Sequence, residues 1–137
     1  MEMIPLCSVE IDVGEKFEIG KTGFGQRLIG EIVAARWQGN RFKAKMVGAA
    51  SADWALTTED GLIQVDVRMT LETDDGELVY VSYTGLLDTA AENAPCRTAI
   101  RFETAADRYQ WLTRTLCVGD GRFDGDKRVT YDIFVLQ

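Results

Sequence analysis

The chain has 137 residues, the size of a single domain with its own hydrophobic core. Its formal net charge of -7 and pI near 4.6 argue against nucleic acid or an anionic membrane surface as a partner. No apolar stretch approaches the ~18 residues of a membrane span, and no basic segment precedes an apolar one at the start, so we expect no membrane segment and no signal peptide. Three widely spaced cysteines predict reduced thiols. We therefore expect one cytoplasmic domain over residues 1–137.

The first third of the chain is typical of β-strands. Apolar and polar residues alternate from Leu6 to Val13, which predicts a half-buried strand. The glycine-rich residues 14–25 predict mainly turns. Their GKTGFG segment lacks the spacing of a phosphate-binding loop, so we expect no phosphate site there. Residues 28–37 and 41–47 predict two more strands that flank a tight turn.

Residues 53–85 contain two long strand patterns that meet at Asp75-Gly76, a strong hairpin signal. If this pair forms a two-residue turn, Arg68 lies opposite Tyr83. On that register both faces of the hairpin mix polar and apolar residues. Mixed faces are typical of a barrel whose interior holds a few polar groups around a small ligand.

The last third predicts more strands and one helix. We expect a loop over residues 85–95, a strand over 96–104, a helix over 105–113, a short strand over 115–118, a turn over 119–127 and a last strand over 129–136. The chain shows no alternation of strands with helices, the pattern that would indicate a parallel sheet. The sequence therefore predicts an all-β fold, a single antiparallel barrel of eight to ten strands with one short helix.

The absence of histidine narrows the possible chemistry. The chain contains no histidine, so it lacks the usual general base and the commonest metal ligand. Its cysteines lack the spacing of a zinc site, and it carries no dinucleotide-binding fingerprint. We expect no metal and no other cofactor.

Carboxylates, arginines, tyrosines and tryptophans remain as candidates. Asp66 and Arg68 share one strand face, where a desolvated carboxylate beside an arginine could act as an acid or base. The alternative is that both are ordinary exposed charges. Each tryptophan could form a flat wall for a ring-bearing ligand or simply pack in the core. The catalytic candidates are Asp66, Arg68, Tyr83 and Asp53, and the substrate-binding candidates are Trp54, Gln64, Arg101 and Trp111.

Several short motifs occur in a distinctive order along nearly the whole chain. They are Asp53-Trp54, Asp66-x-Arg68, Thr73-Asp74-Asp75-Gly76, Gly85, Arg101-Phe102-Glu103-Thr104, Tyr109-x-Trp111-Leu112, Val118-Gly119-x-Gly121 and Val129-Thr130-Tyr131-Asp132. Their order and spacing resemble the domain of unknown function 3237 family. The resemblance implies a small single-domain β-barrel, similar to calycin and allene-oxide-cyclase barrels. It also favours Asp66 and Arg68 pointing into the barrel.

Two functional hypotheses follow. The first is a cofactor-independent isomerase, lyase or cyclase for a small, ring-bearing molecule, with Asp66 as acid or base, Arg68 as charge stabiliser and Tyr83 as hydrogen-bond donor. The second is a noncatalytic barrel that carries or senses small molecules, which the lack of a strong nucleophile favours. In both, the partner is a small-molecule ligand, and a homodimer is possible.

Overall fold

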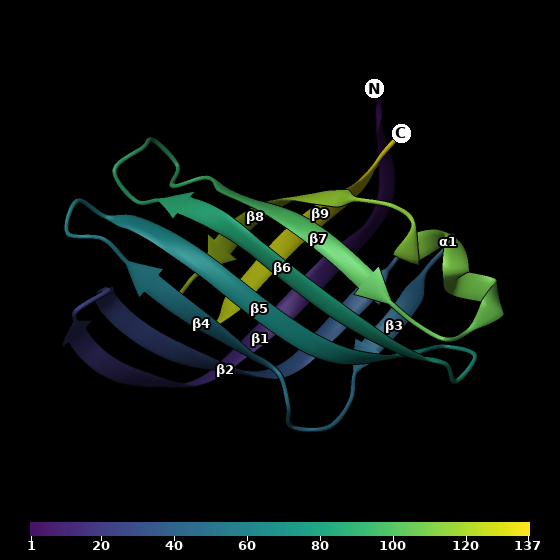
Figure 1. The fold of residues 1–137 in the computed structure, drawn as a ribbon, viewed down its shortest axis with the longest axis horizontal. Coiled ribbons are helices and arrows are strands. Elements are labelled where there is room, and N and C mark those ends of the chain that lie inside the picture. Colours follow the sequence, from purple (N-terminus) through teal and green to yellow (C-terminus); the bar gives the residue numbers. More distant parts are fainter.

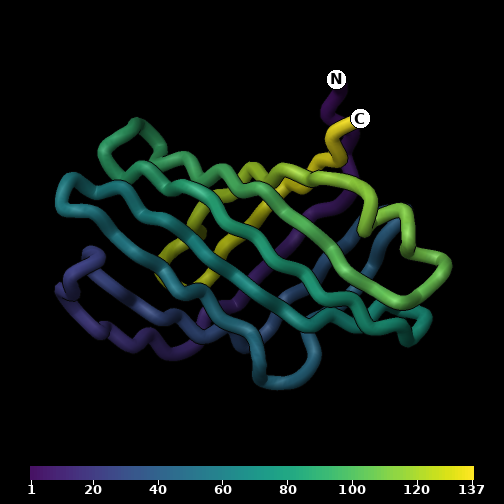
Figure 2. Tube along the Cα trace, in the orientation of Figure 1, coloured from purple at the N-terminus to yellow at the C-terminus, as the bar shows by residue number.

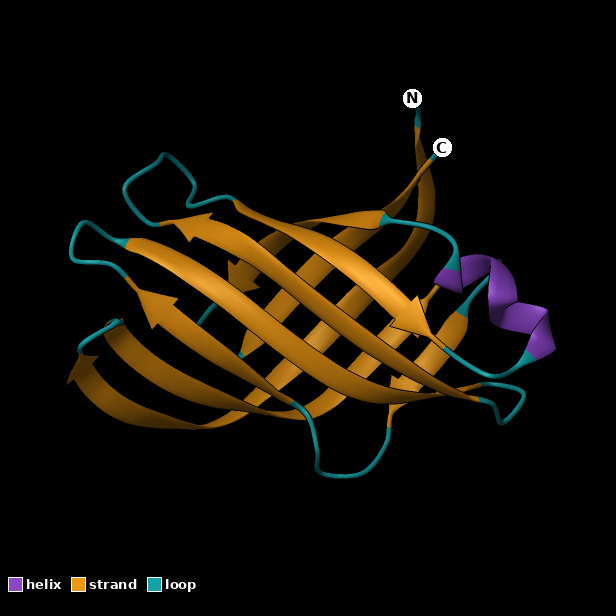
Figure 3. Cartoon of the chain, viewed as in Figure 1, coloured by secondary structure: helices purple, strands orange, loops and turns teal.

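The chain folds into a closed β-barrel with a short helix at one end (Figures 1 and 3). The computed structural model describes residues 1–137. Its strands are β1 (Met3–Thr22), β2 (Gly25–Gln38), β3 (Lys43–Met46), β4 (Ala52–Thr57), β5 (Leu62–Thr73), β6 (Leu78–Asp88), β7 (Cys96–Glu103), β8 (Cys117–Asp124) and β9 (Arg128–Leu136). All neighbouring strands are antiparallel, so the predicted fold class is confirmed.

The barrel closes because every strand has a partner on both sides. Around the wall the order is β1-β9-β8-β7-β6-β5, and β1 also pairs with β2. Both β3 and β4 pair with β2 on one side and β5 on the other, so they lie end to end in one position of the wall. Figure 2 shows the connection between them, residues 47–51, looping out from the wall. Closure removes the sheet edges over most of the wall, whereas the part of β1 that follows Val13 pairs with β2 alone.

The glycine-rich residues 14–25, predicted to be turns, are mostly strand. β1 continues to Thr22 and returns into β2 through a turn at Gly23 and Phe24. Its register with β2 shifts at three places between Asp12 and Gly20. Bulges of this kind insert extra residues and break the period of two. The alternation therefore disappears from the sequence, although the strand pairing continues.

The predicted turn over residues 119–127 is also mostly strand, because β8 extends to Asp124. Glycine serves close packing here, since a Cβ at Gly121 would lie 2.3 Å from the ring of Tyr131. The predicted helix is shorter than expected. It begins as the 3-10 turn η1 (Asp107–Tyr109) and continues as α1 (Gln110–Thr113). The chain has no helix with the length and apolar character needed to cross a membrane.

The β5–β6 hairpin differs by one residue from the predicted register. Its turn is a three-residue loop, with Gly76 in the left-handed region at φ 89°. The Thr73 N–H donates to the Glu77 carbonyl at 2.8 Å, and the Glu77 N–H donates to the Thr73 hydroxyl at 2.8 Å. As a result Tyr83 lies opposite Val67 and not opposite Arg68. When the pairing register shifts by one residue, side chains that were expected on the same face of the sheet lie on opposite faces.

With the observed register, the inner face of the hairpin is apolar throughout. The inner face of β5 carries Ile63, Val65, Val67, Met69 and Leu71, and that of β6 carries Val79, Val81, Tyr83 and Leu87. These side chains join one continuous hydrophobic core inside the barrel. The mixed faces inferred from the sequence therefore came from the wrong register.

Aromatic rings fill the end of the barrel that carries α1. The Phe42 ring makes edge-to-face contacts with Trp37, Phe102 and Tyr109, at centroid distances of 6.4, 5.5 and 5.9 Å. All four rings are buried. Such pairs add to the stabilisation from burial. We call these four residues the aromatic plug.

Asp75 ties the helix to the β5–β6 turn. Its carboxylate accepts hydrogen bonds from the Thr73 hydroxyl at 2.6 Å, the Tyr109 hydroxyl at 2.7 Å and the Arg108 guanidinium at 2.7 Å. These bonds, chiefly those from Thr73 and Tyr109, lower the pKa of Asp75 from 3.8 to about 2. The helix end of the barrel is therefore closed by packing and by polar contacts.

Candidate functional site

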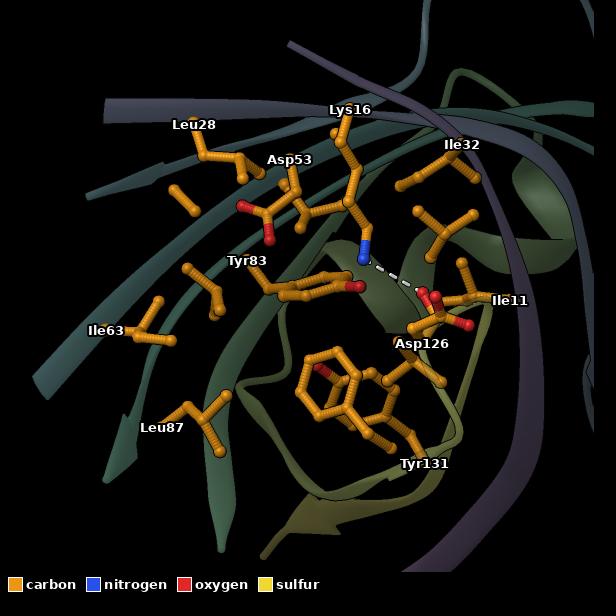
Figure 4. A pocket seen from close by; sticks show the side chains of 17 residues that line it. Ile11, Lys16, Leu28, Ile32, Asp53, Ile63, Tyr83, Leu87, Asp126 and Tyr131 are labelled. Carbon is orange, nitrogen blue, oxygen red and sulfur yellow. Dashed lines mark hydrogen bonds between the residues drawn. The ribbon is translucent and has the colours of Figure 1, made fainter. Parts of the chain in front are cut away.

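A cavity opens in the barrel interior (Figure 4), and no residue of the aromatic plug lines it. Its volume is about 220 Å³, and 13 of the 17 residues that line it are hydrophobic, if the two tyrosines are counted among them. The walls come from β1, β2, β4, β5, β6, β8 and β9 and from the β8–β9 turn. The few polar side chains in such a cavity decide what it can bind. They are Lys16, Asp53, Tyr83, Asp126 and Tyr131.

Asp53 provides the carboxyl group inside the barrel. It lies on β4 opposite Gly30, and its carboxylate accepts a hydrogen bond from the Asp66 main-chain N–H at 2.9 Å. The ladder between β4 and β5 has no pairs at Trp54 and Ala55, so the side chain of Asp53 takes the place of a main-chain acceptor there. This bond fixes the carboxyl group while leaving it open to the cavity.

Burial changes the acidity of Asp53. It raises the pKa from 3.8 to about 6, with a smaller contribution from the charge of Asp66, while the hydrogen bond from the Asp66 N–H acts in the opposite direction. A carboxyl group with this pKa exists in both protonation states near neutral pH. It can therefore accept or release a proton without a large penalty.

Two tyrosines lie against each other beside Asp53 (Figure 4). The rings of Tyr83 and Tyr131 meet edge to face at 5.6 Å, and the Tyr131 hydroxyl lies 3.5 Å from the Cys96 sulfur. Burial raises the pKa of both tyrosines far above the usual value. Both hydroxyls therefore stay protonated and can donate hydrogen bonds at any physiological pH.

Lys16 and Asp126 lie at the opening of the cavity. The Lys16 ammonium donates to the main-chain carbonyl of Asp126 at 2.9 Å (Figure 4). This bond joins β1 to the β8–β9 turn, which are 110 residues apart in the chain. Both side chains are exposed on one side and line the cavity on the other.

The expectation that Asp66 and Arg68 point into the barrel is wrong. Both lie on the outer face of β5, with Gln64, because the buried residues of this strand are the odd-numbered ones. The Arg68 guanidinium stacks on the Trp54 ring at 4.3 Å from its centroid, and that ring does not line the cavity. The pair therefore forms part of the outer surface, as the alternative interpretation of the sequence allowed.

Arg101 and Trp111 are also outside the cavity. Arg101 lies on the exposed face of β7. Trp111 lies on α1, partly buried at the plugged end, and the Arg41 guanidinium covers its ring at 3.9 Å from the centroid. Among the eight candidates from the sequence, the structure brings only Asp53 and Tyr83 together at the cavity.

Sequence reasoning missed Lys16 and Tyr131. Lys16 lies between two bulges of β1, in the glycine-rich segment that was predicted to form turns. Tyr131 was placed correctly in the last strand, where it alternates with Val129 and Ile133, all buried. This alternation could have indicated an inward-facing hydroxyl, but only the closed barrel brings it next to Tyr83.

Comparisons with solved structures place the fold among known barrels. A β-barrel-like protein of Acinetobacter baumannii is 30% identical, with a TM-score of 0.92, and the match covers 99% of this chain and 96% of the other. A conserved protein of unknown function from Rhodopseudomonas palustris is 28% identical, with a TM-score of 0.87 and coverage of 98% and 97%. An enzyme from Penicillium herquei is 17% identical, with a TM-score of 0.75 and coverage of 96% and 93%, which shows a shared fold.

The sequence comparisons agree with the structural ones. A UPF0311 protein of Rhodopseudomonas palustris is 30% identical over 135 residues, which span 88% of this chain and 87% of that protein. The model of a family described as protein of unknown function, DUF3237, matches residues 1–136. With a match over almost its entire length, the chain belongs to the DUF3237 family.

Proposed function

We propose that the barrel is a cofactor-independent enzyme that transfers protons on a small, ring-bearing molecule bound in the cavity. The observation that carries this proposal is a carboxyl group, Asp53, that lies in an apolar cavity with a pKa raised to about 6. Perturbed acids in cavities are a recurring feature of catalytic sites. The reaction classes that need only such a group are isomerisation, elimination and cyclisation.

Asp53 is the acid or base of the proposed reaction. As a carboxylate it removes a proton from a carbon next to a carbonyl group, and as a carboxylic acid it returns the proton at another position. The Asp66 N–H holds one oxygen, so the proton moves to and from the carboxyl group at a fixed place. This assignment moves the role that the sequence suggested for Asp66 to the carboxyl group inside the barrel.

Tyr83 and Tyr131 supply hydrogen-bond donors. Proton removal next to a carbonyl group places negative charge on its oxygen, and neutral hydroxyl groups stabilise that charge best where water is scarce. Both hydroxyls are buried and protonated. The hydrophobic lining holds the ring of the substrate and keeps water out.

The size of the cavity limits the substrate. An apolar cavity of about 150 Å³ accommodates benzene, so about 220 Å³ suits one ring or two fused rings. The enzyme from Penicillium herquei has the same fold at a distance, which is consistent with catalysis in such a barrel but does not identify the reaction.

Hydrogen–deuterium exchange tests the proposal without knowledge of the natural substrate. We expect the protein to accelerate exchange of the protons next to the carbonyl group of 2-tetralone in D2O, measured by NMR. Asp53→Asn keeps an acceptor for the Asp66 N–H but removes the base, so exchange should slow at least about 100-fold. The matched control is Asp74→Asn, an exposed residue of the β5–β6 turn, which should exchange like the wild type. Exchange that persists in Asp53→Asn rejects the assignment.

A noncatalytic binding barrel is the second candidate. The predominance of hydrophobic residues in the cavity favours it, since a carrier needs apolar walls but no base. In that case 2-tetralone should bind with no acceleration of exchange, and Asp53→Asn should leave its affinity unchanged. Binding and exchange measured on the same sample therefore separate the two functions.

A further inference from the structure

We propose that Lys16 binds an anionic group of the ligand, so that the natural ligand is a compact ring bearing a carboxylate or similar oxyanion. This inference rests on the proposed function of the cavity and specifies its substrate class. The anion would lie at the opening, beside Lys16, while the ring lies against the hydrophobic walls and its reacting carbon faces Asp53.

Lys16 has hydrogen-bonding capacity to spare. Its ammonium group carries three N–H donors, and the one hydrogen bond that it makes goes to the main-chain carbonyl of Asp126 at 2.9 Å. That bond holds the long side chain across the opening, between β1 and the β8–β9 turn (Figure 4). A ligand therefore meets a charged group that is already positioned.

The charge of Lys16 is not neutralised by an ion pair. Its ammonium nitrogen has no carboxylate oxygen within 4.0 Å, whereas six other basic residues do. Those six are Lys21, Arg36, Arg97, Arg108, Arg122 and Arg128. Lys16 is also the one basic residue that lines the cavity. A cation at the edge of an apolar cavity attracts an anion more strongly than it would in open water.

Two carboxyl groups also line the cavity, and their positions fit the same ligand. Asp126 is exposed in the β8–β9 turn, and its carboxylate forms no ion pair with the Lys16 ammonium, to which only its main-chain carbonyl is bonded. Asp53 is held on β4 by the Asp66 N–H and repels an anion from its own part of the cavity. An anionic ligand is therefore oriented in one direction, with its charge toward Lys16.

A pair of probes with one shape and two charges tests the proposal. The probes are 2-naphthoate and 2-naphthamide, with affinities measured by titration calorimetry at low salt. Lys16→Met should weaken 2-naphthoate binding about tenfold, the loss typical of one charge-assisted hydrogen bond, and change 2-naphthamide binding less than twofold. The control is Lys21→Met, which removes a charge from the same strand outside this cavity and should leave both affinities nearly unchanged.

The outcomes separate this inference from the proposed function. Equal loss of both probes in Lys16→Met, or equal affinity of the wild type for both, overturns the role of Lys16. Tighter binding of 2-(aminomethyl)naphthalene than of 2-naphthoate also overturns it, because the cavity would then select cations. Exchange of neutral 2-tetralone depends on Asp53 and not on Lys16, so it can persist in each of these cases.

Discussion

The two ends of the barrel use the same kinds of residue for opposite purposes. At the helix end, buried aromatic rings pack against each other, and Asp75 is stabilised as an anion by three donors. At the other end, two tyrosines border an open cavity, and the pKa of Asp53 is raised by burial. The pKa is about 2 for one aspartate and about 6 for the other. We therefore expect the helix end to contribute more to stability, whereas the proposed chemistry lies at the other end.

The largest effect is expected from a change in the aromatic plug. Phe42→Ala removes a ring that is 1% exposed and contacts three other rings, so it should lower the free energy of unfolding by about 3–5 kcal/mol. Urea unfolding measures this loss. The matched control is Phe123→Ala at the cavity, where the ring is 47% exposed, and the loss should stay below about 1 kcal/mol. Equal losses would show that the two ends contribute equally to stability.

The sequence predicted the strands of the barrel but not the register of the β5–β6 hairpin. Alternation predicted most of the strands, and their number without any strand–helix–strand spacing predicted the antiparallel barrel. The alternation did not determine which residues of β5 and β6 share the buried face of the hairpin, since Asp75-Gly76 fits both a two-residue and a three-residue loop. The Thr73 hydroxyl, which accepts from the Glu77 N–H, helps to hold the longer loop, and this contact exists only in the folded hairpin.

The one-residue error in the predicted hairpin register explains why the sequence favoured Asp66 over Asp53 as the acid or base. In the predicted register Asp66 and Arg68 shared a face with Tyr83, whereas in the structure Tyr83 lies inside and the other two lie outside. Asp53 was also a candidate, but its interior position depends on the register of β4 against both β2 and β5, which no local pattern determines. The position of Lys16 was hidden by bulges. Side chains brought together by closure of the barrel leave no local pattern.

A smaller effect is expected from filling the open end. A Cβ at Gly121 would lie 2.3 Å from the Tyr131 ring, so Gly121→Ala forces the ring to move toward the cavity. We expect a loss of about 1–3 kcal/mol in the free energy of unfolding, together with weaker binding of 2-naphthamide. Gly23→Ala is the control, because no atom lies within 4 Å of its added Cβ and it should change neither quantity. Unchanged binding in Gly121→Ala would mean that the position of Tyr131 does not limit the ligand.

The smallest expected effect is the pH dependence of stability that Asp53 and Asp75 cause. The direction of this dependence is opposite for the two residues. Because the pKa of Asp53 is raised, the folded protein holds this proton more tightly than the unfolded chain does. Its contribution to the free energy of unfolding therefore falls as the pH rises from 3.8 to about 6. For Asp75, with a lowered pKa, the contribution is present above pH 3.8 and is lost as the pH falls toward about 2.

Asp53→Asn should therefore stabilise the protein above pH 6, while Asp75→Asn should destabilise it there. The first change removes the cost of an ionised group in an apolar cavity and keeps an acceptor for the Asp66 N–H. Since the carboxyl group is partly solvated through the opening, we expect a gain of about 1 kcal/mol at pH 8 that disappears below pH 4. Urea unfolding of both variants between pH 2 and 8 measures the two curves. A gain for Asp53→Asn that does not vary with pH would show that Asp53 is not desolvated, and the acid–base role proposed for it would lose its physical basis.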